Sequence, residues 1–443
     1  MIKQILKRDG RIVPFNREKI SFAILQAAVA VGGRDRVKAE KVTDDVVRLL
    51  EQRQRGDSIP TVEEVQDLVE KALIERGHAK TAKAYIVYRY EHALKRAGRK
   101  SLTYSADNIP YEKLWEALSW AVDHNCVQLR QISECIRENR YEQLIRDCEE
   151  FYGQELTRAV EKLSERLDSV KMVIIAGPSS SGKTTTTIKV EQQLKPLGYS
   201  FVPINVDHFF LDLKDHPKDL RGDYDFETPQ ALDIPLINQT FRSLLQEKRV
   251  EIPFYNFKTG RREGSSGHMQ LREGEILLID SLHGLFPEMS EGIPEEQKFR
   301  LYIETLSQVK DGTNQFVRWA DIRLLRRMVR DMLFRNYSPA QTIRHWHFVR
   351  RSELRYIVPR LREADSIVNS FLPYEIPIMK HRLGDLFPAF VREFANDTDS
   401  ADAHDRALRI QRVFEQVPAW TDERIVPRDS LLREFIGGSE YDY

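Results

Sequence analysis

The sequence predicts an α/β protein in which a doubly wound parallel sheet follows a small, mostly helical domain and a helical connector. Strand-like and helix-like patterns alternate through residues 168–395, as they do when a helix joins each parallel strand to the next. A glycine-rich loop separates the first of these strands from a helix. Amphipathic helical spacing dominates the preceding segments. We therefore expect domains at 1–95 and 168–395, a connector at 96–167 and a C-terminal extension at 396–443.

The composition is typical of a soluble globular protein, and the balance of charges disfavours nucleic acid and membranes as partners. Lysine plus arginine and aspartate plus glutamate both number 68, so the net charge is +0 and attracts neither nucleic acid nor an anionic membrane. No apolar run approaches the ~20 residues of a membrane span. The three cysteines lack metal-binding spacing. We expect a cytoplasmic protein without membrane or nucleic-acid partners, and the sequence leaves a homo-oligomer open.

The N-terminal segment begins with a hairpin pattern, because two short apolar runs flank Asp9-Gly10, a dipeptide favoured in tight turns. Thr61 is a predicted helix N-cap, since acidic residues fill the turn that follows it. The expected helices of this segment are Ile20–Val31, Ala39–Glu51 and Thr61–Arg76.

The segments on either side of the sheet domain carry no chemical motif. Leu114, Leu118 and Val122 form one apolar stripe of the connector, and such stripes are most often packing faces. In the tail we expect a charged linker at 395–406, a short helix near 407–415 and an extended end.

An eight-residue motif carries the strongest functional signal in the sequence. The pattern G-x-x-x-x-G-K-[ST] is matched by Gly177, Pro178, Ser179, Ser180, Ser181, Gly182, Lys183 and Thr184. A buried-strand pattern precedes it, and helix-compatible sequence follows from Thr185. Backbone N–H groups at a helix N-terminus bind phosphate. We expect these residues and Thr185 to hold a nucleotide, with Lys183 at its outer phosphates and the Thr184 hydroxyl on Mg²⁺. The alternative is a chance turn before a helix.

Two acidic residues follow strand patterns at the edge where ligands bind such sheets. Asp207 is placed to accept a proton from a substrate hydroxyl, although a turn or helix cap is the alternative. Asp280 ends an apolar run typical of a strand whose acid holds Mg²⁺. No Asn-Lys-x-Asp sequence is present, which disfavours a GTP switch. The five expected strands are Met172–Ala176, Phe201–Val206, Glu275–Ile279, Arg300–Ile303 and Ser366–Val368.

Further residues suit an acceptor pocket and a lid. Residues 222–229 and 253–262 combine aromatic side chains, which provide stacking walls, with polar groups that can bind sugar hydroxyls. Arginines then recur at helical spacing, at Arg323, Arg326, Arg327 and Arg330. A lid helix of arginines can neutralise a phosphoryl group during its transfer. Ordinary loops and a solvated basic face are the alternatives.

In this order the motifs resemble those of the uridine kinase and phosphoribulokinase family of P-loop kinases. The matching pieces are residues 177–184, 207–210, 224–233, 255–257 and 326–331. The resemblance implies a P-loop NTPase fold and Mg²⁺-dependent transfer of the γ-phosphoryl group of ATP to a small-molecule hydroxyl, most readily a nucleoside. Its implied roles are a general base at Asp207, a ribose-binding acid at Glu227 and a pocket-lining residue at Tyr255. From the motifs themselves we expect charge stabilisation by Lys183, Arg326, Arg327 and Arg330, Mg²⁺ ligands at Thr184 and Asp280, and an acceptor contact at Asp225.

The sequence departs from that family at the pocket for the acceptor. Uridine kinases tend to carry a histidine where Gly260 stands, and Arg261 and Arg262 follow it here. Two arginines at this place suit an acceptor that already carries phosphate, so a kinase for a phosphorylated sugar stays open. A non-catalytic, nucleotide-responsive regulator is a third alternative, disfavoured by the zero net charge and the lack of cysteine pairs.

The first 95 residues resemble the ATP-cone, a nucleotide-sensing module of ribonucleotide reductases and their repressor. The matching segments are residues 7–10, 15–20, 61–66 and 83–89. By this resemblance Lys7, Arg8 and Lys19 contact the phosphates of a regulatory adenine nucleotide. The chain would then hold two nucleotides, one in each domain. The alternative is a hairpin-and-helix domain with surface lysines.

Overall fold

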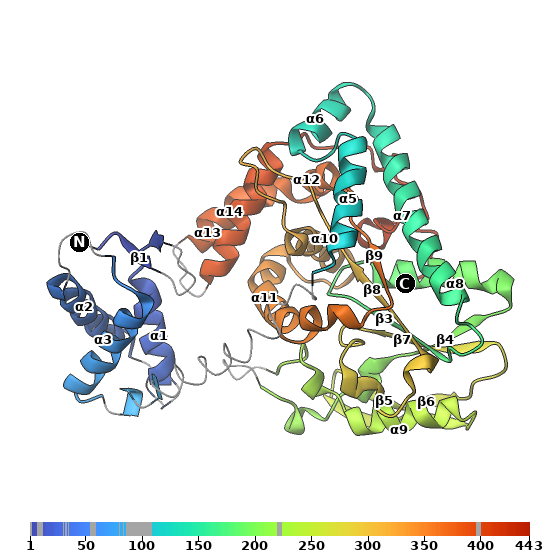
Figure 1. The fold of residues 1–443 in the computed structure, drawn as a ribbon, viewed down its shortest axis with the longest axis horizontal. Helices are drawn as coiled ribbons and strands as arrows, with labels where there is room; N and C mark the ends of the chain where they lie inside the picture. The colour runs from blue at the N-terminus through green and yellow to red at the C-terminus, as the bar shows by residue number, and fades with distance from the viewer. Residues whose placement is uncertain are drawn as a thin grey trace. The chain divides into compact units, whose positions relative to one another are not determined.

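The chain forms two compact units, Met1–Ser105 and Ala106–Tyr443, in the computed structural model (Figure 1). The units have separate hydrophobic cores. The structure describes residues 2–6, 12–29, 31, 33, 35–53, 59–78, 80–82, 84–85, 109–218, 224–395 and 400–443.

Within its described residues, the N-terminal unit contains the expected hairpin strands and the three expected helices. Its elements are β1 (Gln4–Leu6), β2 (Ile12–Pro14), α1 (Glu18–Val29), α2 (Arg36–Arg53) and α3 (Val62–Glu75). The predicted N-cap is confirmed, because the Glu64 N–H donates to the Thr61 hydroxyl at 3.2 Å and the Thr61 N–H donates to the Glu64 carboxylate at 2.7 Å. Lys19 lies exposed on α1. Lys7 and Arg8 lie outside the described residues.

A five-stranded parallel sheet is the centre of the large unit, in the order β4-β7-β3-β8-β9. The strands are β3 (Met172–Ala176), β4 (Ser200–Ile204), β7 (Glu275–Ser281), β8 (Lys298–Glu304) and β9 (Ser366–Asn369). Each lies within two residues of its predicted bounds at both ends. The predicted parallel sheet is therefore confirmed.

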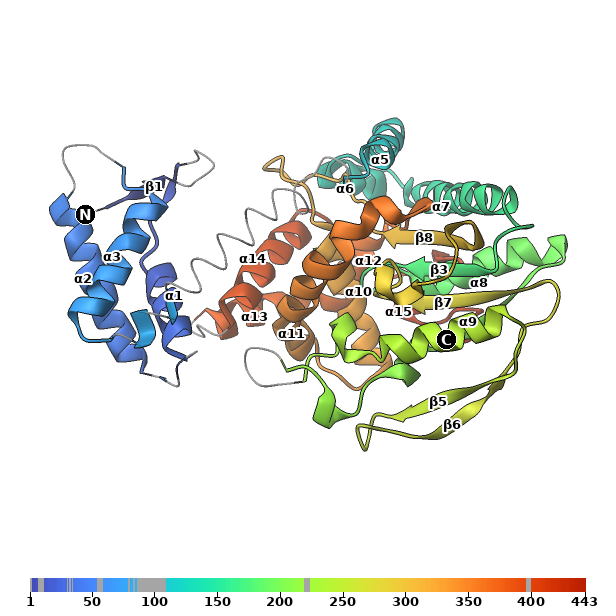
Figure 2. The same ribbon diagram turned by 60° about the horizontal axis from the view of Figure 1, so that its bottom comes forward.

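The central strand β3 packs on both faces of the sheet, as a doubly wound fold requires. Met172 and Ile174 contact a cluster that includes α9 (Ile234–Leu245). Val173 and Ile175 face the opposite cluster, which includes α7 (Tyr141–Ser164). Figure 2 shows the sheet between these two helices.

The segments that flank the sheet domain share its core. Leu144 of α7 and Phe435 of the tail lie in one hydrophobic cluster with the sheet. The charged linker expected at 395–406 is wrong for its second half, because α14 (Ala401–Glu415) already begins there and buries Ala403. The other helices of this unit are α5 (Tyr111–Asp123), α6 (Leu129–Arg137), α8 (Lys183–Leu194), α10 (Trp319–Phe334), α11 (Pro339–Ser352), α12 (Glu375–Leu383), α13 (Phe387–Phe394) and α15 (Arg433–Ile436).

A two-stranded antiparallel ribbon, β5 (Val250–Asn256) with β6 (Arg261–Met269), forms where sequence patterns gave no strand. Its second strand is polar and mostly exposed, so it lacks the apolar alternation of a half-buried strand. Gly260 makes the turn with φ +67°, and a Cβ there would lie 2.1 Å from Leu213 Cδ1. The turn therefore favours glycine at this position.

No described helix is long and apolar enough to cross a membrane.

Candidate active site

The glycine-rich loop runs from the end of β3 into α8 with two close backbone contacts. A Cβ on Gly177 would lie 2.4 Å from the Ile303 carbonyl oxygen, so only glycine fits beside β8. Gly182 caps α8 with φ +91°, a left-handed conformation that disfavours other residues. Lys183 Nζ donates to the Gly177 carbonyl at 3.2 Å, which folds the lysine back over the loop.

The loop presents unused donors, as an anion site would. The first helical hydrogen bond of α8 runs from the Thr186 N–H to the Gly182 carbonyl, which leaves the N–H groups of residues 183 and 184 without a helical partner, while the Thr185 N–H donates to the Glu434 carboxylate at 3.2 Å. The buried hydroxyls of Ser180 and Ser181 also lack a partner among the described residues. These donors and the glycine contacts fit a bound phosphate chain.

Two predicted acids lie beside this loop because of the sheet register. Asp280 pairs with Ile175 near the end of β3, and Ile279 pairs with the last residue of β4, three residues before Asp207. Burial raises the pKa of Asp280, and the charge of Lys183 opposes that shift. An exposed Thr184 hydroxyl and a half-buried Asp280 carboxylate fit Mg²⁺, which takes one or two protein oxygens beside phosphate oxygens and water.

Asp207 is a solvent-exposed residue, and the surrounding protein partly encloses its carboxylate. This enclosure raises the pKa of Asp207, while His208, Arg335 and Lys183 hold it down. The charge of Lys183, a residue of the phosphate loop, is thus one of the effects on the pKa of the candidate base. An accessible carboxylate with a raised pKa is a suitable proton acceptor.

The arginines of α10 divide into two groups. Arg323 and Arg326 are fully buried. Arg323 donates to the Ser179 carbonyl at 3.0 Å, and Arg326 makes a two-point contact with the Glu375 carboxylate at 2.6 and 2.7 Å. Arg326, one of the predicted lid arginines, therefore lies in the interior beside the loop. Its guanidinium already has hydrogen-bond partners within the protein.

Arg327 and Arg330 are half-buried and nearer the open side of the loop. Arg327 donates to the Ser179 hydroxyl at 3.2 Å and lies 3.8 Å from Glu227. Burial lowers the pKa of Arg330, and the charge of Arg335 adds to that shift. Both arginines also contact Asp331, at 3.2 and 3.5 Å, and the remaining N–H groups of each guanidinium can bind an anionic ligand.

An aromatic cluster covers the acceptor side. Ring centroids lie 5.6 Å apart for Phe210 and Tyr255, 5.4 Å apart for Phe210 and Phe226, and 4.3 Å apart for His216 and Phe226. Phe257 joins the cluster at 5.0 Å from Tyr255 and is 59% exposed. The exposed rings leave aromatic surface available for a planar ligand.

Polar residues of the predicted acceptor pocket lie around these rings. The Tyr255 hydroxyl is buried and has no partner among the described residues. The Glu227 N–H donates to the Asp225 carboxylate at 3.1 Å. Burial raises the pKa of Glu227, and the neighbouring Arg327 opposes that shift. Both acids are half-buried and retain acceptor oxygens.

The two arginines after Gly260 differ in their surroundings. Arg262 forms an ion pair with Asp233 at 2.9 Å, and its N–H donates to Asp212 at 3.0 Å. Arg261 is exposed on β6. The charge of Arg262 is therefore already balanced within the chain.

Two residues near the loop were not found by sequence reasoning. His283 follows β7, and neither of its buried ring nitrogens has a hydrogen-bond partner among the described residues. Burial lowers the pKa of His283 to about 4, despite an opposing effect of the Glu227 carbonyl. Glu434 reaches the loop from the C-terminal tail. His283 follows Asp280 by three residues in the sequence, so its position could have identified it as a residue near the site. No local sequence motif identifies Glu434.

Comparison with known proteins matches both units to families. Residues 3–94 match the sequence profile of the ATP cone domain, and residues 172–376 match that of the phosphoribulokinase / uridine kinase family. Uridine kinase from Deinococcus deserti is 27% identical over 195 residues, 44% of this chain and 84% of that protein. Uridine kinase from Lactobacillus helveticus is 26% identical over 204 residues, 46% of this chain and 88% of that protein.

Among solved structures, D-glycerate 3-kinase from Cryptococcus neoformans var. grubii covers 59% of this chain and 87% of that one, at 13% identity and a TM-score of 0.25. The assignment depends instead on the two family matches and on the sheet order, phosphate loop and acids described above. Both resemblances drawn from the sequence are confirmed. The chain thus carries a kinase domain of the phosphoribulokinase / uridine kinase family at residues 172–376 and an ATP-cone domain at residues 3–94.

Proposed function

We propose that this chain transfers the γ-phosphoryl group of ATP to a hydroxyl group of a nucleoside. The observation that carries the proposal is the convergence of Lys183, Asp207 and Asp280 at the carboxyl edge of the sheet. The sheet register brings the strands before both acids beside the phosphate loop, and the charge of Lys183 acts to lower the pKa of each acid, which supports a shared site. Phosphoryl transfer needs a cation at the phosphates, a metal-binding acid and a group that orients the nucleophile.

Each residue has a role that its surroundings support. Asp207 accepts the proton of the attacking hydroxyl, which its raised pKa favours. Lys183, Arg327 and Arg330 stabilise negative charge on the phosphoryl group. Mg²⁺, held by Thr184 and Asp280, supplies charge neutralisation at the phosphate oxygens when it is bound.

A nucleoside is the acceptor class that the pocket best supports. The base would stack on exposed rings such as Phe226 and Phe257, which are 37% and 59% exposed. Asp225 and Glu227 offer oxygens to sugar hydroxyls, and the curated relatives are uridine kinases. A phosphorylated sugar is less well supported, since Arg262 is already paired with Asp233.

We also propose that the N-terminal unit senses an adenine nucleotide and adjusts the kinase. The family match over residues 3–94 supports this role. Lys19 is exposed on α1 and available to a phosphate, and Lys7 and Arg8 are the other proposed contacts. A sensor in one unit and a catalyst in the other require a coupling free energy between two sites.

The test is ADP release by the purified chain with Mg·ATP and a panel of acceptors. The panel contains ribonucleosides, deoxyribonucleosides and sugar phosphates, and each is repeated with Asp207→Asn. We expect turnover with one or more nucleosides and its loss in the variant. Turnover with sugar phosphates alone would instead identify a phosphorylated sugar as the acceptor. ADP release that ignores both the acceptor and Asp207 would refute the assigned site.

A further inference from the structure

The C-terminal tail places a carboxylate on the first turn of the phosphate-loop helix. The Thr185 hydroxyl donates to Glu434 Oε2 at 2.7 Å, and the Thr185 N–H is 3.2 Å from the same oxygen. The Tyr443 hydroxyl lies 3.0 Å from the Thr185 hydroxyl. Figure 1 marks the C-terminus beside α8. A chain segment about 250 residues away thus occupies donors of the loop.

This tail is fixed by several contacts. Leu431 packs so closely on Gly182 that a Cβ there would lie 2.3 Å from Leu431 Cδ1. Lys189 of α8 pairs with Asp429 at 2.8 Å. Leu431 and the ring of Phe435 are fully buried in the main core. Glu434 is therefore held at the loop by the packing of its neighbours.

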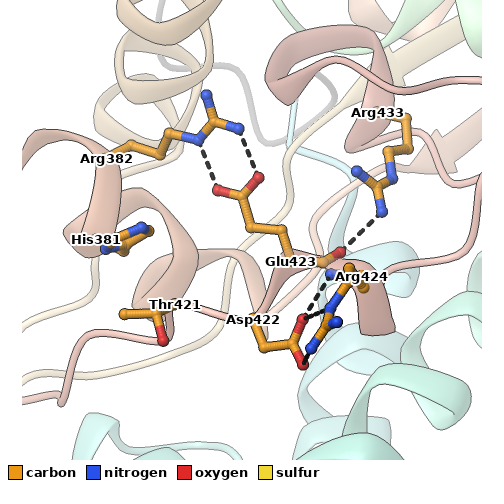
Figure 3. Close-up of a pocket in the computed structure, with 7 residues that line it drawn as sticks. All are labelled: His381, Arg382, Thr421, Asp422, Glu423, Arg424 and Arg433. Carbon is orange, nitrogen blue, oxygen red and sulfur yellow. Dashed lines mark hydrogen bonds and ion pairs between the residues drawn. The ribbon is translucent and has the colours of Figure 1, made fainter.

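Further contacts fix the start of the tail in an open pocket (Figure 3). Arg382 makes a two-point ion pair with the Glu423 carboxylate, and Arg433 donates to the Glu423 carbonyl at 2.8 Å. Arg424 pairs with Asp422 at 2.7 Å. Arg382 and Arg424 are paired with the two acids of this pocket, and Arg433 is held by backbone carbonyls, so we assign the pocket to anchoring the tail.

The same N–H group cannot serve both Glu434 and a phosphate. A backbone N–H has one proton, and the first-turn N–H groups of a phosphate-loop helix are the ones that contact phosphate oxygens. A carboxylate and a phosphate within a few ångströms also repel each other, most strongly where water is excluded. Glu434 is 8% exposed, so water screens its charge poorly.

We infer that Glu434 is an internal competitor for the nucleotide phosphates and holds the donor site in a state of low affinity. This inference rests on the proposed ATP-dependent function and concerns how that site is regulated. The buried tail stays in place, and binding requires only that the Glu434 side chain rotates away from Thr185.

The lid helix offers the displaced carboxylate another partner. The guanidinium of Arg330 lies 5.9 Å from the centroid of the Phe435 ring, next to Glu434 in the sequence. Burial lowers the pKa of Arg330, and the charge of Glu434 is one of the effects that oppose the shift. Rotation of the Glu434 side chain toward Arg330 would therefore release Thr185 for the donor.

The test is calorimetric titration of the full chain with the Mg²⁺ complex of a non-hydrolysable ATP analogue. Glu434→Gln keeps an oxygen that can accept from Thr185 and removes the charge. We expect its affinity at the kinase site to rise about tenfold or more, from the loss of repulsion at short range. Glu440→Gln is the matched control, because Glu440 is an exposed acid of the same tail, and we expect no change.

Lys183→Ala assigns the affected site, since the gain from Glu434→Gln should disappear when the phosphate loop is disabled. If Glu434→Gln does not fold, Glu434→Asp retracts the same charge and should give a smaller gain. Unchanged or weaker binding in a folded variant would refute the inference that Glu434 competes with the nucleotide. It would not affect the proposed kinase function. Failure of every variant, wild type included, to bind at the loop would overturn both proposals.

Discussion

At the scale of single residues, the surroundings of Asp207 fit its proposed role as the proton acceptor. Asp207 follows β4, interacts with Lys183, and has a raised pKa because protein surrounds its carboxylate. An aspartate in bulk solvent would be a weaker base, and a fully buried one could not reach a substrate. The intermediate environment suits a group that must accept a proton and remain accessible.

The first prediction concerns pH. The carboxylate is the active form of Asp207, so kcat/KM should fall as pH drops through its pKa. Since that pKa is raised, the fall should begin at higher pH than for an unperturbed aspartate. Asp207→Asn should lower kcat about 100-fold or more and remove this acidic limb. Steady-state rates across pH measure both effects.

The control for Asp207 is Asp215→Asn, because the Asp215 side chain is 61% exposed on a neighbouring turn. It should leave kcat and the pH profile unchanged. An Asp207→Asn enzyme that keeps both the rate and the acidic limb would assign the proton acceptor to another residue.

The second prediction concerns His283. Its ring nitrogens are buried without partners among the described residues, and unsatisfied groups of this kind cost about 1–3 kcal/mol. His283→Leu should therefore leave the free energy of unfolding unchanged or raise it by about 1 kcal/mol. If the imidazole contacts a substrate, KM for donor or acceptor should rise roughly tenfold in the same variant.

Denaturant unfolding and steady-state kinetics separate the two roles of His283. Loss of stability with unchanged kinetics would identify a packing residue. His283→Asn, which restores a polar group, should recover part of the KM if the ring donates or accepts a hydrogen bond.

At the scale of elements, the regularly spaced arginines of α10 have two different roles. Some are buried and pair with acids in the interior, and others are half-buried beside the phosphate loop. Helical spacing correctly brings Arg323 and Arg327 to the same loop, where both contact Ser179. Spacing could not tell which arginines face the interior. That depends on α12, which supplies Glu375 as the buried partner of Arg326.

The third prediction follows from this division. Arg326→Met leaves Glu375 buried and unpaired, which should cost about 3–5 kcal/mol of unfolding free energy. Adding Glu375→Leu should restore much of that stability. Arg327→Met should change stability by less than about 1 kcal/mol and reduce kcat instead, because Arg327 is half-buried. Urea unfolding of the four proteins gives the comparison, and equal losses for both arginines would contradict it.

The β5–β6 ribbon is an element that hydrophobic patterns in the sequence did not predict. The five core strands were predictable, because strands buried on both faces are continuous apolar runs. Strand β6 is polar and mostly exposed, whereas β5 buries Ile252 and Tyr255, and the pairing of the two strands is set by the Gly260 turn and by contact with the sheet domain. The residue types of the acceptor pocket were therefore predictable, but the strands that carry Tyr255 and Arg262 were not.

At the scale of the whole molecule, two family matches in one chain predict two nucleotide sites. Calorimetry should show about two adenine nucleotides per chain, one for each nucleotide-binding family matched. Lys183→Ala should remove one site. Lys7→Ala with Lys19→Ala should remove the other and abolish any dependence of the rate on a second nucleotide. A single site in the wild-type chain, or a rate curve untouched by the double variant, would reject the sensor.

The sequence by itself determined the parallel sheet, the phosphate loop, the acids that follow its strands and the two-family organisation. These depend on local signals, since apolar runs, glycines and capping residues act through near neighbours. Only the tertiary structure decided which arginines are buried, how the polar ribbon pairs, and that Glu434 lies on Thr185. Those contacts join residues far apart in the sequence, so their energy comes from packing and charge pairing that no local pattern encodes.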